Sequence, residues 1–83
     1  MQYALSRHAQ FRLAERKIAL AWLERVLVSP QRTEADPDEP ALEHRLAAIP
    51  ECGGRVLRVV CDPRQNPLKI VTVHFARSMK GKP

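Results

Sequence analysis

Three histidines could supply acid–base chemistry in this chain, because imidazole is the side chain that most easily gains and loses a proton near neutral pH. They come from three separate stretches: His8 from a helical pattern, His44 from an alternating pattern, and His74 from the end of a β-rich run. Arginines lie close to each of them in the sequence. This inventory suits metal-free cleavage of RNA, in which a base takes the 2′-hydroxyl proton, an acid protonates the 5′ oxygen and cations stabilise the phosphorane. Packed or solvent-exposed histidines are the competing interpretation.

The candidate catalytic residues are two histidines and two arginines. His8 and His44 are the expected acid and base, and Arg12 and Arg58 are the expected cations at the phosphate. We expect His8 and His44 to reach one phosphate-sized site at the open edge of a sheet. The residues expected to bind nucleic acid around it are Arg45, Arg55, Thr72, His74 and Arg77.

No metal or cofactor is expected in this chemistry. The acidic residues cluster in one loop, and no His/Asp spacing typical of metal ligands is present. The Gly53-Gly54 pair is more simply a turn than a phosphate-binding loop. Cys52 and Cys61 lack zinc-ligand spacing, so reduced thiols are expected.

A β-hairpin is the clearest predicted element. Residues 55–61 and 68–75 are rich in β-forming side chains and flank the turn-forming segment DPRQNP. If Asp62 lies opposite Pro67, one face carries Arg55, Leu57, Val59, Cys61, Leu68, Ile70, Thr72 and His74. A slip of one residue would exchange the faces, so the register stays open.

Two helices are predicted before the hairpin. Ser6 is a suitable N-cap for a helix over residues 7–16, and a broad apolar face with Trp22 predicts a second helix over residues 18–28. On the first helix His8, Arg12 and Glu15 form one polar stripe. We interpret this stripe as facing the body of the protein or a cleft, with a surface ion pair between Arg12 and Glu15 as the alternative.

The remaining segments predict the rest of a sheet. Residues 41–49 alternate as a strand would, although their composition also suits a helix. Residues 3–5 are expected to be extended, and residues 31–33 could pair as an edge strand. Residues 31–40 form an acidic loop, either a solvated connector or a shield over a basic groove. The basic C-terminal tail, residues 77–83, is expected to fray.

Composition favours an anionic partner. Fourteen Lys and Arg against nine Asp and Glu give a formal charge of +5 over 83 residues. Such a balance suits RNA or an acidic protein. No apolar run has the roughly 18 residues of a membrane span, and the N-terminus is unlike a signal peptide, so we expect no membrane partner and a cytoplasmic location.

The chain as a whole resembles a family of small bacterial proteins related to the RelE-like toxins and the barnase–EndoU–colicin–RelE group of ribonuclease folds. The resemblance rests on the segments SRHAQFRLAERKI, VLVSP, EHRLA, GGRVLRVV and IVTVHFAR. The polar residues within its motifs are His8, Arg12, Glu15, Arg16, Arg58 and Thr72. After the VTV segment such proteins often carry a tyrosine, where this chain has His74.

We therefore expect residues 1–83 to form a single RelE-like α+β domain, in which two N-terminal helices pack on a three- or four-stranded antiparallel sheet. The expected function is a metal-free ribonuclease, the toxin of a toxin–antitoxin pair, with an acidic antitoxin protein as partner. A non-catalytic RNA- or ribosome-binding module of the same fold is the first alternative. A protein-interaction domain that receives an acidic segment is the second.

Overall fold

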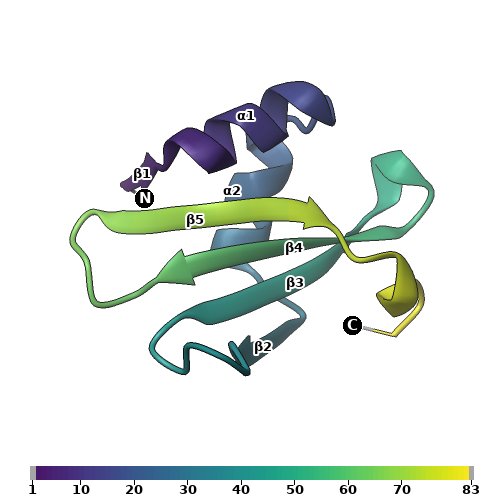
Figure 1. Cartoon of the computed structure of the whole chain (residues 1–83). Coiled ribbons are helices and arrows are strands. Elements are labelled where there is room, and N and C mark those ends of the chain that lie inside the picture. Colours follow the sequence, from purple (N-terminus) through teal and green to yellow (C-terminus); the bar gives the residue numbers. More distant parts are fainter. Residues whose placement is uncertain (1, 83) are drawn as a thin grey trace.

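The computed structural model describes residues 2–82. Two helices and five strands account for most of the chain (Figure 1). In order, the elements are β1 (Tyr3–Leu5), α1 (Arg7–Glu15), α2 (Leu20–Val28), β2 (Arg32–Ala35), β3 (Glu43–Ile49), the 3₁₀ turn η1 (Pro50–Cys52), β4 (Arg55–Asp62), β5 (Leu68–Phe75) and the 3₁₀ turn η2 (Arg77–Met79). Helix α2 lies behind the sheet in Figure 1, and α1 runs along β5.

The sheet is five-stranded and mixed, in the order β1-β5-β4-β3-β2. Strand β1 pairs parallel to β5 through Tyr3↔Leu68 and Leu5↔Ile70, and the other neighbours are antiparallel. The α+β class with two helices is as predicted, but the three- or four-stranded antiparallel sheet is wrong. A three-residue strand carries too little pattern to reveal a partner more than sixty residues away in the sequence.

The predicted hairpin is present, but its register differs from the prediction. Strands β4 and β5 are antiparallel, with Asp62 opposite Lys69 rather than Pro67, and the register shifts between Val60 and Cys61. This β-bulge places an extra residue in β5 and reverses the faces beyond it, so His74 shares a face with Arg58. Side-chain alternation alone does not reveal a bulge.

Helix α1 begins at the predicted cap. The Ser6 hydroxyl accepts a 3.0 Å hydrogen bond from the Ala9 amide and donates a 2.7 Å bond to the Val71 carbonyl. The cap therefore also attaches α1 to β5. The chain reverses after α1 at Lys17, whose φ is 54°, and α2 begins at Leu20, two residues later than predicted.

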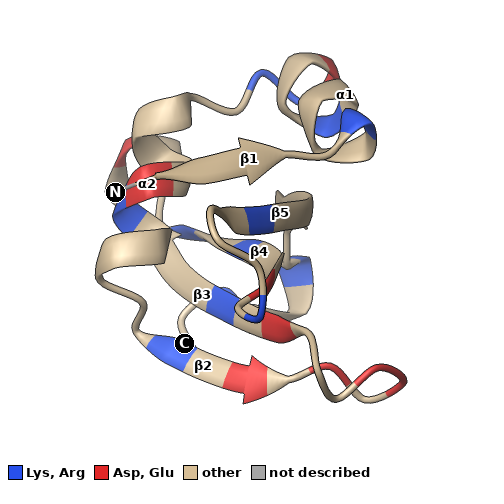
Figure 2. Ribbon diagram, turned by 90° about the vertical axis from the view of Figure 1, so that its left-hand side faces the viewer, with Lys and Arg blue, Asp and Glu red and all other residues tan. Residues whose placement is uncertain are grey.

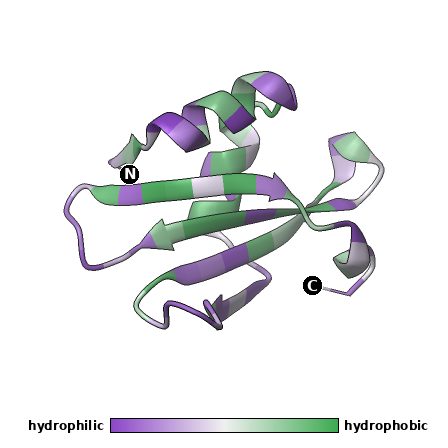
Figure 3. Cartoon of the chain, viewed as in Figure 1, coloured by the Kyte–Doolittle hydropathy of each residue, from purple (hydrophilic) through white to green (hydrophobic). Residues whose placement is uncertain are grey.

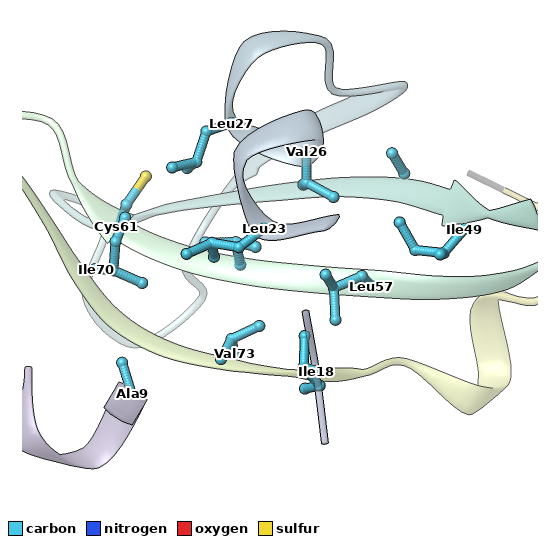
Figure 4. Packing of buried hydrophobic residues seen from close by; sticks show 12 residues of the cluster. Ala9, Ile18, Leu23, Val26, Leu27, Ile49, Leu57, Cys61, Ile70 and Val73 are labelled. Carbon is cyan, nitrogen blue, oxygen red and sulfur yellow. The ribbon is translucent and has the colours of Figure 1, made fainter. Parts of the chain in front are cut away.

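The main core lies between α2 and the sheet (Figure 4). Its fully buried large side chains include Leu23 and Val26 of α2 and Leu57 of β4. Trp22, predicted to be buried against the sheet, is only partly buried and packs at the margin of this cluster. Loss of a buried leucine such as Leu23 would cost about 2–5 kcal/mol.

Within residues 2–82, neither α1 nor α2 covers the opposite side of the sheet, which is called the open face here. In Figure 3, β3 and β5 carry hydrophilic bands between hydrophobic ones. A small second cluster on this face joins Leu46 and Val56 to Ala76 and Met79. The Ala76 amide donates a 2.8 Å hydrogen bond to the Val56 carbonyl. The segment expected to fray thus includes a 3₁₀ turn, η2, that is held against the sheet.

Candidate functional site

A groove rich in arginine lies between the C-terminal part of α1 and the end of β5. Its cavity of about 250 Å³ is lined by Arg12, Arg16, Arg55, His74, Phe75 and Arg77. We call it the arginine groove. Four cationic side chains and no carboxylate line it, so it has the electrostatic character of an anion site.

Helix α1 supplies one wall of the arginine groove. Arg12 and Arg16 are one turn apart, so they project from the same side of the helix. Glu15 lies 3.1 Å from Arg12 and 3.7 Å from Arg16, and all three side chains are between 33% and 55% exposed. Exposed ion pairs of this kind contribute about 0–1 kcal/mol. Both arginines can therefore turn toward an anion at small cost.

The opposite wall contains a stacked pair. The guanidinium carbon of Arg55 lies 4.0 Å from the centre of the Phe75 ring, a cation–π contact. Neither Arg55 nor Arg77 makes a side-chain hydrogen bond or ion pair to any residue from 2 to 82. Their donors are thus available to a ligand.

His74 lies on the open face where it meets the groove. It is directly opposite Arg58 on the neighbouring strand. Burial lowers the pKa of His74, and the positive charges of Arg58 and Arg12 and the nearby His44 lower it further. The imidazole is therefore neutral at pH 7 and able to accept a proton.

A hydrogen-bonded network extends from Arg58 across the open face. His44 is 11% exposed and lies between two partners: its Nε2 is 2.6 Å from Asp36 Oδ1, and its Nδ1 is 2.6 Å from the Arg58 guanidinium. Arg58 also donates a 3.1 Å bond to Glu34. Because arginine can only donate, Nδ1 must accept and Nε2 carries the proton given to Asp36. Both ring nitrogens are thus occupied.

The network holds its carboxylates ionised. The hydrogen bond from His44, followed by the Glu39 backbone amide, lowers the pKa of Asp36. The hydrogen bond from Arg58 lowers the pKa of Glu34. The acidic loop between β2 and β3, red at the lower right of Figure 2, is therefore more than a solvated connector, because Asp36 anchors it to the open face.

The structure does not bring the two expected catalytic histidines together. His8 is exposed on α1, and His44 is buried in the network on β3. Neither lines the arginine groove. The expected shared site of His8 and His44 at the open edge of the sheet is therefore wrong, because the sequence pattern does not reveal the two partners that occupy the His44 ring.

Of the other predicted residues, four line the arginine groove and three do not. Arg12, Arg55, His74 and Arg77 line the groove. Arg45 lies on the helix-covered side, where it donates 2.7 Å and 3.1 Å hydrogen bonds to Glu43 and to the Leu27 carbonyl of α2. The groove thus excludes Arg45, whose side chain is only 18% exposed.

The remaining predicted residues lie beside the groove. Arg58 is held in the network behind His74. Thr72 is half-buried opposite Val60, two residues before His74 on β5. Both border the arginine groove without lining it.

Two groove residues were not among the predicted site residues. Arg16 could have been found from its spacing of four from Arg12, which places both on one helical face. Phe75 reads as an ordinary strand residue, and its stacking on Arg55 depends on the bulged register.

Among residues 2–82 no three His, Cys, Asp or Glu side chains form a group suited to a metal ion. Cys52 and Cys61 are free thiols, and burial raises the pKa of Cys61. No helix within those residues is long and apolar enough to cross a membrane.

Comparison with known proteins identifies the family. A family model described as "Domain of unknown function (DUF4258)" matches residues 5–75. This match spans most of the chain, so the protein belongs to that family. Neither the curated proteins nor the solved structures gave a match.

Proposed function

We propose that this protein binds single-stranded RNA in the arginine groove and cleaves it without a metal ion, as RelE-like ribonucleases do. The observation that carries this proposal is the convergence of four arginines on a neutral histidine, His74, with no carboxylate in the lining. Arginine suits phosphate because its planar guanidinium donates paired hydrogen bonds.

The proposed chemistry uses His74 as the base. The 2′ oxygen bonds to phosphorus as its proton passes to the His74 imidazole, and the bond from phosphorus to the 5′ oxygen breaks. The departing oxygen takes a proton from solvent, because the groove lining includes no second histidine. Arg12 and Arg16 stabilise the charge on the phosphorane. The products are a 2′,3′-cyclic phosphate and a 5′-hydroxyl end.

RNA binding without cleavage is the second candidate function. The single histidine of the groove favours it, since acid–base cleavage is usually faster with two such groups. The groove has the same charge complementarity for the acidic segment of an antitoxin protein, which would then compete with RNA.

Cleavage in EDTA tests the proposal. A labelled single-stranded RNA is incubated with wild type, His74→Gln and His8→Gln at pH 7. We expect His74→Gln to lose about 10²–10⁴-fold in rate and His8→Gln to stay within about tenfold of wild type. Binding without cleavage by wild type would leave the second candidate. Equal cleavage by wild type and His74→Gln would rule out His74 as the base.

A further inference from the structure

A second, less polar cavity adjoins the arginine groove. Its volume is about 350 Å³, and Arg55, Val56, Phe75, Ala76, Arg77 and Lys80 line it. Cavities that bind small organic ligands have volumes of about 300–1,000 Å³. The new cavity is therefore large enough to hold a single nucleobase.

The two cavities share a wall. Arg55, Phe75 and Arg77 line both of them, so they meet at the Arg55–Phe75 stack. The groove adds Arg12, Arg16 and His74 on its side, whereas the second cavity adds Val56, Ala76 and Lys80 on the other. One side thus suits a phosphate and the other suits a flat, weakly polar ring.

The shared wall is itself a stacking surface. The guanidinium carbon of Arg55 lies over the Phe75 ring, 4.0 Å from the ring centre. Arg55 makes no side-chain hydrogen bond or ion pair within residues 2–82, and it is exposed. Guanidinium planes and aromatic rings are the surfaces on which proteins stack unpaired bases.

The floor of the second cavity is fixed by packing. Val56 and Ala76 belong to the small apolar cluster of the open face with Leu46 and Met79. The 2.8 Å hydrogen bond from the Ala76 amide to the Val56 carbonyl holds η2 in place. The cavity is therefore formed before any ligand arrives, and binding needs little reordering of the chain.

We propose that this second cavity is a nucleobase subsite, which holds one unstacked base of the RNA strand whose phosphate occupies the arginine groove. This proposal rests on the proposed RNA binding and specifies which form of RNA the site accepts. The base must leave its stack to enter, so the site selects single-stranded over duplex RNA. Adjacent apolar and cationic lining gives no reason to expect strong preference among bases.

The test compares two ligands that differ only in the base. Backbone amide NMR titration measures the affinity for adenosine 5′-monophosphate and for ribose 5-phosphate. We expect the nucleotide to bind at least about tenfold more tightly than ribose 5-phosphate, because stacking of a base on a protein side chain contributes about 1–3 kcal/mol. The nucleotide should shift the backbone amide resonances of Val56 and Ala76, and ribose 5-phosphate should leave those resonances unchanged.

Two variants locate the effect. Arg55→Lys keeps the charge but removes the stacking plane, so the ratio of the two affinities should fall toward one. Lys69→Gln removes a charge from the start of β5, outside both cavities, and should leave the ratio unchanged.

The other possible outcomes contradict the base subsite, and they show whether the phosphate groove fails with it. Equal affinity for the two ligands contradicts the base subsite but leaves the phosphate groove intact. Failure of both ligands to bind contradicts the groove as well. Tighter nucleotide binding with an unaltered ratio in Arg55→Lys, or with shifts confined to other amides, places the base elsewhere.

Discussion

Nδ1 of His44 accepts a 2.6 Å hydrogen bond from the guanidinium of Arg58, and this contact holds both side chains in place on the open face. Since Asp36 occupies Nε2 at 2.6 Å, the His44 ring has no nitrogen left for a substrate. Arg58, held also by Glu34, is kept opposite His74. His44 is therefore a positioning residue, and His74 is the histidine that lines the arginine groove.

Replacement of His44 should affect stability more than catalysis. His44→Ala leaves Asp36 and Arg58 without their shared partner, so the free energy of unfolding should fall by about 1–3 kcal/mol in a urea titration. His44→Gln can accept from Arg58 and donate to Asp36, so it should recover part of that loss. Its cleavage rate should stay within about tenfold of wild type. A stable His44→Gln protein that has lost 10²-fold or more in rate would return His44 to the catalytic site.

His74 should titrate below the ordinary histidine value of about 6.5. Burial is the first cause of the lowered pKa, and Arg58 and Arg12 are the next. The unfolded chain then binds more protons below about pH 6.5, so His74 reduces stability as the pH falls through that range. NMR titration of the imidazole should show Arg12→Gln raising the pKa of His74, with Lys69→Gln as the matched loss of charge that leaves it unchanged. A midpoint at or above 6.5 in wild type would contradict the described environment.

Arg45 should matter for folding and not for RNA. It donates to the Leu27 carbonyl in the last turn of α2 and to Glu43, on the helix-covered side of the sheet. Arg45→Gln should lower the free energy of unfolding by about 1–3 kcal/mol without changing the salt dependence of RNA affinity. A smaller salt dependence in a folded Arg45→Gln protein would place RNA on the helix side instead.

Much of the fold follows from local sequence signals. The Ser6 cap, the two helices and the β4–β5 hairpin each depend on residues near one another in the chain. The parallel pairing of β1 with β5 depends on residues at opposite ends of the chain, and nothing in a three-residue strand signals it.

The site was less predictable, because it depends on the sheet register. The bulge between Val60 and Cys61 turns His74 onto the face of Arg58. The sequence of β5 does not show where an extra residue is inserted, so the faces could not be assigned beforehand. The acidic partners of His44 and Arg58 come from an edge strand and a loop whose composition resembles any solvated connector.

The salt dependence of RNA affinity tests most directly whether the arginine groove is the RNA site. Each phosphate contact on a single strand contributes about 0.7 to the slope of log affinity against log salt. The double variant Arg12→Gln/Arg16→Gln removes two groove cations, and Arg7→Gln/Lys69→Gln removes two exposed cations outside the groove lining. We predict that the groove variant binds single-stranded RNA more weakly, with a slope smaller by about 1.4, while the control keeps the wild-type slope. Equal slopes for wild type and the groove variant would contradict the account.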